Sequence, residues 1–422
     1  MKWLTAVLLA AVAGCSSIQQ SQSTSGDRWL LTGTKVYVSP DAPPLENAWV
    51  LVSGSKIEAV GTASTARPKG IRTDSACSGG VITAGFQNSH VHFIDTVFGD
   101  AATRPAADLE QSLNRMLTSY GFTTVVDTGS LVDNTVALRQ RIERGDVKGP
   151  AILTAGLPLY PPNGLPIYLR DLPPALLSQL PQPATTDEAV AIVRRNFASG
   201  ANGTKLFVAT PQGGGEIKRM SPDIARAAAA ETHARGGLVM AHPTDPEGVA
   251  AAVTAGVDIV VHTTIDGRKG DTWSPDLIRD MRARNVSVIP TLKLWRYELA
   301  KAKVPANIQD LIVGDAEKQL KAFSDAGGQV LFGTDVGYMS EFDPTDEYVL
   351  MAHAGLTPVQ ILTSLTTAPA ARWRAEGTRG RVQPKLAADL VVLNGDPVTD
   401  VKRFADVKCT IRAGRAVFVR ME

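Results

Sequence analysis

Six residues of metal-binding type follow short apolar segments spread over most of the chain: His90, His92, Lys205, His242, His262 and Asp335. The segments read GFQNSHVHF, GTKLFV, GLVMAHP, DIVVHTT and QVLFGTD, and helix-like sequence separates them. Neutral imidazole binds zinc and similar divalent metals, and a carboxylate completes such a ligand set while leaving a position for water. We therefore predict the two-metal site of a metal-dependent hydrolase.

His90 and His92 are two residues apart in a predicted strand. Because alternate side chains of a strand share one face, both imidazoles can bind the same cation. A histidine pair in a strand can equally be a hydrogen-bonded part of the core. The recurrence favours the metal site, since four of the six histidines in the chain follow strand-like segments. The other two, His233 and His353, end helix-like segments and are left out of the site.

Alternating strand-like and helix-like segments predict the elements that bring these residues together. In an α/β barrel the carboxyl ends of the parallel strands meet at one face, where the active site forms. We predict a TIM-type (β/α)8 barrel over residues 82–379. Short strand and turn patterns at both chain ends predict a small β-sandwich built from residues 28–81 and 380–422.

Several of these motifs resemble the amidohydrolase superfamily, in particular its imidazolonepropionase-like branch with the binuclear, metal-dependent Xaa-Pro (prolidase-like) dipeptidases. The resemblance runs from about Trp29 to the C-terminus and rests on GFQNSHVHF, NGTKLF, VMAHP, VVHTT, FGTD and AADLVVLNGDP. It implies two divalent ions, which we expect to be Zn²⁺, bound by the histidines and the aspartate. Two positions depart from the family pattern: Ala84 replaces the usual proline, and Asn88 replaces a frequent aspartate.

Lys205 indicates which subgroup the chain resembles. An ammonium group beside a dication would be repelled, whereas a carbamate formed with carbon dioxide is anionic and offers one oxygen to each metal. The resemblance implies this carboxylated lysine as a bridge, although a lysine at a strand end can also simply reach solvent. Mononuclear relatives usually lack it, so its presence favours a binuclear site that cleaves an amide or peptide bond.

The expected mechanism uses a hydroxide that bridges the two metals. His90, His92 and Asp335 are assigned to one ion, and His242 and His262 to the other. Asp335 is the predicted catalytic residue, because a carboxylate that touches the nucleophile can take its proton and pass it to the leaving amine. Tyr160 and Tyr338 follow the third and eighth predicted strands. Each could donate a hydrogen bond to the tetrahedral intermediate, or could be a loop aromatic that packs on its neighbours.

The substrate is predicted less directly. Residues 158–177, PLYPPNGLPIYLRDLPPALL, form a loop rich in proline and aromatic residues that we expect to shape the pocket. Arg170, Lys293 and Arg296 could bind a substrate carboxylate or be solvated surface charges. We expect a small-molecule substrate, either a dipeptide or an N-acyl amino acid, including Xaa-Pro dipeptides and aromatic amides resembling ochratoxin.

Two alternatives stay open. One is a cyclic-amide or lactone hydrolase that uses the same metals in a different pocket. The other is a surface lipoprotein that binds metal without catalysis. A chain of 422 residues with 44% hydrophobic content is large enough for a barrel core. The 43 basic and 42 acidic residues nearly balance, and we see no basic patch that would indicate nucleic-acid binding. The resemblance implies a homo-oligomer.

The N-terminus carries a separate signal. Lys2 precedes an apolar run over residues 4–13, which predicts a signal peptide over residues 1–14. The sequence VAGC resembles a bacterial lipobox, which implies a lipidated Cys15 and a flexible tether over residues 15–27. Ser16 in place of aspartate implies attachment to the outer membrane of the cell envelope, facing the periplasm. An ordinary signal with an incidental cysteine is the alternative.

Only Cys77 and Cys409 would remain in the mature protein. Both fall in the terminal sections assigned to the β-sandwich. A disulfide between them is possible, but the sequence leaves their proximity open.

Overall fold

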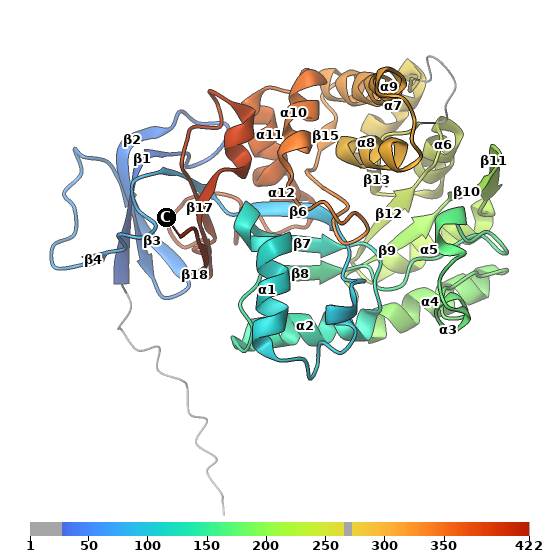
Figure 1. Cartoon of the computed structure of the whole chain (residues 1–422), viewed down its shortest axis with the longest axis horizontal. Helices are drawn as coiled ribbons and strands as arrows, with labels where there is room; N and C mark the ends of the chain where they lie inside the picture. The colour runs from blue at the N-terminus through green and yellow to red at the C-terminus, as the bar shows by residue number, and fades with distance from the viewer. Residues whose placement is uncertain (1–27, 266–271, 422) are drawn as a thin grey trace, which may run out of the picture.

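The computed structural model describes residues 28–265 and 272–421. The predicted signal peptide, the lipidated Cys15 and the tether therefore lie outside the described residues. The described chain combines a set of parallel strands, covered by helices, with a mainly antiparallel sheet at one side (Figure 1). This is an α/β architecture with a second, β-rich part.

Eight parallel strands form the part of the fold that positions the predicted site residues. Three of them pair in one sheet: β6 (Phe86–Val91), β7 (Phe122–Asp127) and β8 (Ala151–Thr154). Five pair in another: β9 (Gly203–Phe207), β12 (Leu238–His242), β13 (Ile259–Val261), β14 (Ser287–Ile289) and β15 (Gln329–Val330). Most residues of these strands are buried, as expected where helices and packed side chains cover both faces of a parallel sheet.

Isolated parallel bridges join these two sheets at both edges. Leu159, after β8, pairs with Leu206 in β9, and Val336, after β15, pairs with Val91 in β6. The backbone N–H of Ser89 also donates to the carbonyl oxygen of Phe332 at 2.7 Å. Strand neighbours therefore run in chain order from β6 to β15 and return to β6.

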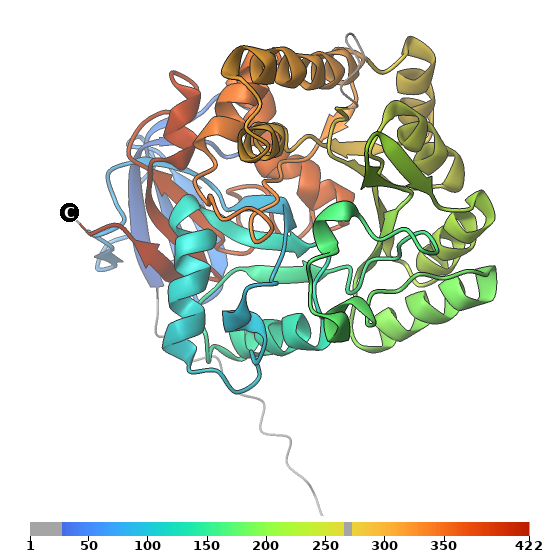
Figure 2. The ribbon, with the colours of Figure 1, turned by 45° about the vertical axis from the view of Figure 1, so that its right-hand side comes forward.

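Helices surround the parallel strands (Figure 2). They are α1 (Ala106–Met116), α2 (Val132–Arg144), α3 (Pro174–Leu177), α4 (Thr186–Ala198), α5 (Pro222–Ala234), α6 (Pro246–Ala255), α7 (Pro275–Ala283), α8 (Leu292–Lys301), α9 (Ala306–Asp325), α10 (Thr345–His353), α11 (Pro358–Leu365) and α12 (Thr367–Arg372). Short 3-10 turns are η1 (Thr96–Phe98), η2 (Thr118–Tyr120), η3 (Ile167–Leu169) and η4 (Val401–Ala405). None of the described helices combines the length and the apolar character that a membrane crossing requires.

The chain ends meet in the mainly antiparallel sheet, whose order is β18-β17-β16-β5-β1-β2-β3, with β4 paired to β1. Its strands are β1 (Arg28–Val36), β2 (Leu45–Ser53), β3 (Lys56–Gly61), β4 (Arg72–Thr73), β5 (Val81–Ala84), β16 (Leu390–Leu393), β17 (Val407–Arg412) and β18 (Arg415–Val419). Where we expected the two facing sheets of a sandwich, the strands pair in one continuous sheet, because β5 pairs with both β1 and β16. A separate hairpin, β10 (Ala209–Gly213) and β11 (Glu216–Arg219), follows β9.

A disulfide joins the two chain ends within this sheet region. Cys77 and Cys409 are bonded, with their Cα atoms 5.4 Å apart. Both cysteines are fully buried in an apolar core that also contains Trp29, Leu31 and Ile411. The pairing that the sequence left open is therefore present.

Candidate metal centre

All six predicted ligand residues line one cavity of about 690 Å³. Each comes from the carboxyl-terminal part of a parallel strand or from the segment that follows it: His90 and His92 from β6, Lys205 from β9, His242 from β12, His262 from β13 and Asp335 from β15. Five of them are buried, and the His92 side chain is 16% exposed. The strands thus gather residues from distant parts of the chain at one site.

Three ligand-type atoms converge at one point. Nε2 of His90 lies 3.2 Å from Oδ1 of Asp335, and Nε2 of His92 lies 3.0 Å from the same oxygen. The two Nε2 atoms are 3.1 Å apart. Nε2 of His262 lies 4.0 Å from the other carboxylate oxygen, Oδ2 of Asp335. His90, His262 and Asp335 offer ligand atoms within 4.8 Å of one another, which is a spacing that suits a metal ion.

Hydrogen bonds behind two of the histidines fix which ring nitrogen faces the centre. Nδ1 of His92 lies 2.9 Å from the carbonyl oxygen of Gly129. Nδ1 of His262 lies 2.6 Å from Oγ1 of Thr291, whose hydroxyl already donates to the carbonyl of Pro290. Both oxygens can only accept here, so Nδ1 carries the proton in each ring. In the neutral ring Nε2 therefore keeps its lone pair, as a metal ligand requires.

This tautomer provides a test of whether the residues fit a metal. The Nε2 lone pair of His92 faces Oδ1 of Asp335 at 3.0 Å. Two acceptors at this distance repel each other unless a proton or a cation neutralises them. A divalent ion accepts both lone pairs at once, so the donor set fits a metal.

Burial keeps most of the imidazoles in the neutral form that binds metals. It lowers the pKa of His90 and of His242 to about 3, and it holds the pKa of His262 well below its usual range. For Asp335, burial alone would raise the pKa, but the neighbouring His90 and His92 hold it well below the usual range. His90, His242 and His262 therefore present neutral nitrogens beside an ionised carboxylate, whereas the pKa of His92 is raised, because burial is outweighed by the hydrogen bond and the charge of Asp335.

Lys205 lies on the side of the cavity near His242. Its Nζ is 5.6 Å from the centre of the Phe207 ring, and that ring stacks on the His242 ring with centroids 4.8 Å apart. The His242 and His262 rings have centroids 4.9 Å apart. Burial lowers the pKa of Lys205 to about 7, because a cation loses its hydration there. The environment of Lys205 thus disfavours a free ammonium group.

Two of the candidate ligand residues have an unusual backbone conformation. His262 has φ of 78° and Asp335 has φ of 60°, in the left-handed region that residues other than glycine seldom adopt. Such a conformation costs about 1–3 kcal/mol and persists only where the surroundings impose it. Gly337 serves the same segment: a Cβ there would lie 1.9 Å from the carbonyl oxygen of His92. A glycine at 337 therefore allows the Asp335 segment to approach β6.

Two supporting residues were not predicted from the sequence. Thr291 holds His262, as described above. Asp127, at the end of β7, accepts hydrogen bonds from Oγ of Ser130 at 2.6 Å and from the backbone N–H of Gly129 at 3.3 Å, so it orders the turn that holds His92. The signal for Asp127 was available, because it ends an apolar strand in the same way as the predicted ligands. Thr291 has no comparable sequence signal.

Asn88 supports His90 through hydrogen bonds, although it replaces the aspartate that is frequent at this position in the family pattern. Its Nδ2 donates to Oγ1 of Thr334 at 2.7 Å, and its Oδ1 accepts from the backbone N–H of His90 at 3.1 Å. The amide therefore links β6 to the segment that carries Asp335. An aspartate here would lose the donor to Thr334.

Both predicted tyrosines line the cavity. The Tyr160 ring stacks on Phe207 with centroids 4.5 Å apart. The Tyr338 hydroxyl donates to Oε1 of Glu298 at 3.0 Å, and its ring meets Tyr168 edge to face at 5.6 Å. Residues 158–177 also contribute to the cavity wall, as predicted.

The three candidate carboxylate-binding cations do not line the cavity, which corrects the expectation from the sequence. Nη2 of Arg170 donates to Oε1 of Gln212 at 2.9 Å, Nζ of Lys293 donates to the carbonyl of Asp343 at 2.7 Å, and Arg296 pairs with Asp310 at 3.3 Å. Each cation is engaged by other groups. Among the described residues that line the cavity, Lys205 is the only lysine or arginine.

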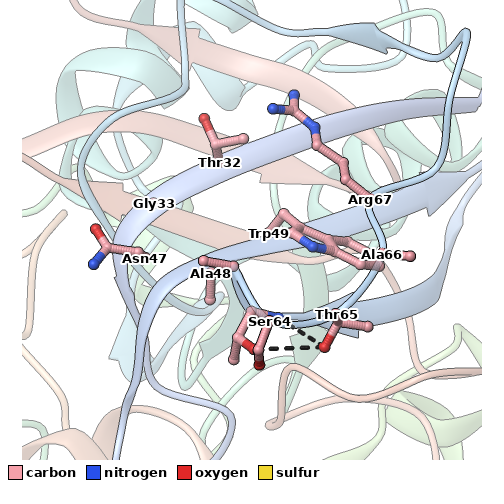
Figure 3. Close-up of a pocket in the computed structure, with 11 residues that line it drawn as sticks. Thr32, Gly33, Asn47, Ala48, Trp49, Ser64, Thr65, Ala66 and Arg67 are labelled. Carbon is pink, nitrogen blue, oxygen red and sulfur yellow. Dashed lines mark hydrogen bonds between the residues drawn. The ribbon is translucent and has the colours of Figure 1, made fainter.

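A second hollow, of about 610 Å³, lies on the mainly antiparallel sheet beside Trp49 (Figure 3). Thr32 from β1 and residues 62–67 also line it. Arg67 is its one ionisable lining residue. A single cation offers neither a ligand set nor an acid–base pair, so the chemistry is assigned to the larger cavity.

Comparison with known proteins identifies a matching family and similar structures. The model of the amidohydrolase family matches residues 81–417. The chain is 24% identical to an ochratoxinase from Aspergillus niger over 410 residues, which covers 87% of this chain and 82% of that protein. A crystal structure of a Xaa-Pro dipeptidase with bound methionine has a TM-score of 0.76 at 20% identity and covers 92% of this chain and 99% of its own. A prolidase complexed with N-methylphosphonate-L-proline has a TM-score of 0.75 at 25% identity and covers 93% of this chain and 100% of its own.

Proposed function

Because the chain belongs to the amidohydrolase family, we propose that it is a binuclear metal-dependent hydrolase that cleaves the amide bond of dipeptides or N-acyl amino acids. The observation that carries this proposal is the convergence of His90, His92 and Asp335 on one point, with atoms 3.0–3.2 Å apart. The relatives named Xaa-Pro dipeptidase, prolidase and ochratoxinase support amide bonds as the substrate class.

We propose that residues 82–379 form a (β/α)8 barrel, with residues 28–81 and 380–422 as a composite β-domain. The chain-order neighbours of the parallel strands, and the bridges that return from β15 to β6, support the barrel. A closed barrel would explain why six ligand residues from five strands face one cavity. The β-domain contributes no residue to that set.

His90, His92 and Asp335 would hold one Zn²⁺, His242 and His262 a second, and Lys205, carboxylated by carbon dioxide, would contact both. When bound, the ions supply a Lewis acid that polarises the scissile carbonyl and lowers the pKa of water. The buried position of Lys205 supports the carbamate, since an ammonium group there would be both desolvated and repelled.

Asp335 is the group of this chain that moves the proton. Its carboxylate takes a proton from the attacking water and passes it to the nitrogen of the leaving amine. Tyr160 and Tyr338 are the candidate donors to the developing oxyanion, since both line the cavity. The Tyr338 hydroxyl would first have to leave its bond to Glu298.

For the location of the protein, we propose a lipid anchor at Cys15 in the outer membrane of a bacterial cell envelope, with the enzyme facing the periplasm. The Cys77–Cys409 disulfide supports an oxidising compartment. The partners would be the membrane, a small-molecule amide substrate and further copies of this chain in a homo-oligomer.

Metal analysis coupled to a substrate screen tests the proposal. The purified protein is expected to hold two divalent ions per chain and to hydrolyse members of a panel of dipeptides and N-acyl amino acids. Exclusive turnover of cyclic amides or lactones would instead assign the same centre to ring opening. No turnover of amides, lactones or esters by fully metallated protein would contradict catalysis and favour a metal-binding lipoprotein.

A further inference from the structure

The mouth of the active-site cavity is rimmed by exposed apolar side chains. Eleven large apolar residues are exposed in the described chain, and six of them line this cavity: Ile94, Leu131, Ile167, Tyr168, Leu172 and Leu176. Exposed apolar side chains are ordinary when scattered, but their concentration at one opening marks a binding surface. We call these six residues the apolar rim.

The part of the apolar rim around Ile167 and Tyr168 is held in place by the hairpin beside it. Arg170, which follows η3, donates from Nη2 to Oε1 of Gln212 in β10 at 2.9 Å. Gln212 donates in turn from Nε2 to the carbonyl oxygen of Leu165 at 3.2 Å, and Thr210 donates to the carbonyl of Gly164 at 2.8 Å. These bonds fasten the segment before and after Tyr168. A surface that is ordered before binding loses little entropy when a ligand covers it.

The rim is continuous with the metal centre. Tyr168 meets the ring of Tyr338 at 5.6 Å, and Tyr338 lies on the segment that carries Asp335. The same cavity is also lined by the apolar side chains of Phe207, Leu294 and Trp295. An amide placed at the metal ligands therefore has an apolar path to the surface on one side.

The charges along this path indicate which part of a substrate could lie on the apolar rim. The six rim residues carry no ionisable group other than the Tyr168 phenol, the acidic Asp95 and Glu298 also line the cavity, and Lys205 is the only lysine or arginine among the described lining residues. An anionic part of a substrate lying on the rim would lose water without gaining a cationic partner. A long alkyl chain would instead cover apolar side chains that now face water.

We propose that the apolar rim is the subsite for a long acyl chain, and that the substrate is an N-acyl amino acid of the fatty-acyl type. This inference rests on the proposed function, since it places the scissile amide at the metal centre. In the reaction the acyl carbon–nitrogen bond breaks, and one water supplies oxygen to the acyl carbon and hydrogen to the nitrogen. The products are a fatty acid and an amino acid, and the class of reaction that supplies the substrate is N-acylation of an amino acid.

A chain-length series tests the subsite. The zinc-loaded full chain is assayed with N-acetyl-, N-octanoyl- and N-dodecanoyl-phenylalanine below their aggregation concentrations. kcat/KM is expected to rise from acetyl to dodecanoyl, by at most about fourfold for each methylene that the rim covers. Values that are flat or fall with chain length would overturn the subsite, although cleavage of any member would still support amide hydrolysis.

Variants of rim residues test whether the apolar rim causes the dependence of kcat/KM on acyl-chain length. Leu172→Ser and Leu176→Ser are expected to shrink the ratio of dodecanoyl to acetyl kcat/KM by about tenfold, mainly through a higher KM for the long substrate. Leu311→Ser is the matched control, because Leu311 is 64% exposed on α9 and lies outside the cavity; it should leave the ratio unchanged.

Two outcomes of the variant experiment would contradict the proposal. One is an unchanged ratio in folded rim variants, with folding checked by the thermal unfolding midpoint. The other is an unchanged ratio accompanied by a loss of oligomeric mass in size-exclusion chromatography with light scattering, which would assign the rim to contact between copies of this chain. Failure of every amide in the series with metallated wild-type protein would contradict the proposed function itself.

Discussion

Nε2 of His90 lies 3.2 Å from Oδ1 of Asp335, although these are the first and the last of the six candidate ligands along the chain. The contact exists because the segment after β15 returns to β6: the backbone N–H of Asp335 donates to the carbonyl oxygen of His90 at 3.0 Å. The contacts that join the first and last parallel strands are therefore the same contacts that bring His90 and Asp335 together at the candidate metal centre. Changes that separate these two segments should cost both stability and metal binding.

Gly337 tests this coupling. We expect Gly337→Ala to lower the free energy of unfolding by several kcal/mol, because its Cβ would lie 1.9 Å from the carbonyl oxygen of His92 and the backbone has φ of 98°. Denaturant unfolding measures the loss. Gly236→Ala is the control, since Gly236 has φ of 76° with nothing within 4 Å, and should cost only about 1 kcal/mol. Equal losses in the two variants would show that the close approach to His92 is unimportant.

Thr291 is expected to act by positioning His262. Thr291→Val keeps the shape of the side chain but removes the oxygen that accepts from Nδ1 of His262, so metal affinity should fall by about 10- to 100-fold. Thr291→Ser keeps the hydroxyl and should stay near wild type. Zinc competition with a chelating dye measures the affinity without relying on activity. A zinc affinity equal to that of wild type in the Thr291→Val variant would contradict the positioning of His262 by Thr291.

Lys205 is expected to act as a carbamate and not as a cation. Lys205→Ala should lose metal and activity, and a short carboxylic acid added in solution should restore part of both by supplying two oxygen ligands. Lys205→Arg should show no such recovery, because guanidinium stays cationic beside the ions and still fills the space. Metal content by mass spectrometry is the readout. Full metal content and activity in the arginine variant would contradict the bridge.

Glu347 should make stability depend on pH. Its carboxylate accepts the backbone N–H groups of Leu292 and Lys293 at the start of α8, and burial raises its pKa to about 7. The folded state therefore holds this proton more tightly than the unfolded state, in which the glutamate pKa is near its ordinary value of 4.5. The stabilisation is full below about pH 4.5 and is lost as pH rises through 7.

The Glu347→Gln variant isolates this contribution. Between pH 4.5 and pH 8 the wild-type protein should lose up to about 3 kcal/mol of unfolding free energy relative to the variant, because only the wild type carries the titrating carboxyl group. Urea unfolding at several pH values measures it. A difference that is constant over this range, or that shifts in favour of wild type, would contradict the raised pKa.

The sequence predicted which residues would meet in one cavity because their signal is local. Each follows an apolar strand, and parallel strands bring such positions to one face whatever the details of packing. Asp127 carried this signal too and was overlooked, since it binds the turn behind His92 and not the centre itself. The loop over residues 158–177 was predicted separately, from its content of proline and aromatic residues, and it does line the pocket.

What the sequence could not predict depends on tertiary partners. Arg170, Lys293 and Arg296 look alike as free cations in a sequence, yet each is engaged by Gln212, a backbone carbonyl or Asp310. The disulfide was open for the same reason, because the distance between Cys77 and Cys409 follows from the pairing of β5 with β16. Loop conformation likewise hides the apolar rim, whose members are spread over residues 94–176.

Stoichiometric reconstitution tests the central claim most directly. Metal-free protein is titrated with Zn²⁺ in bicarbonate buffer while hydrolysis of an amide substrate is followed. The binuclear account predicts that activity rises to a plateau at two equivalents per chain, and that a His90→Ala/His92→Ala double variant stays inactive although its circular dichroism matches wild type. Full activity at one equivalent, or turnover before any metal is added, would contradict it.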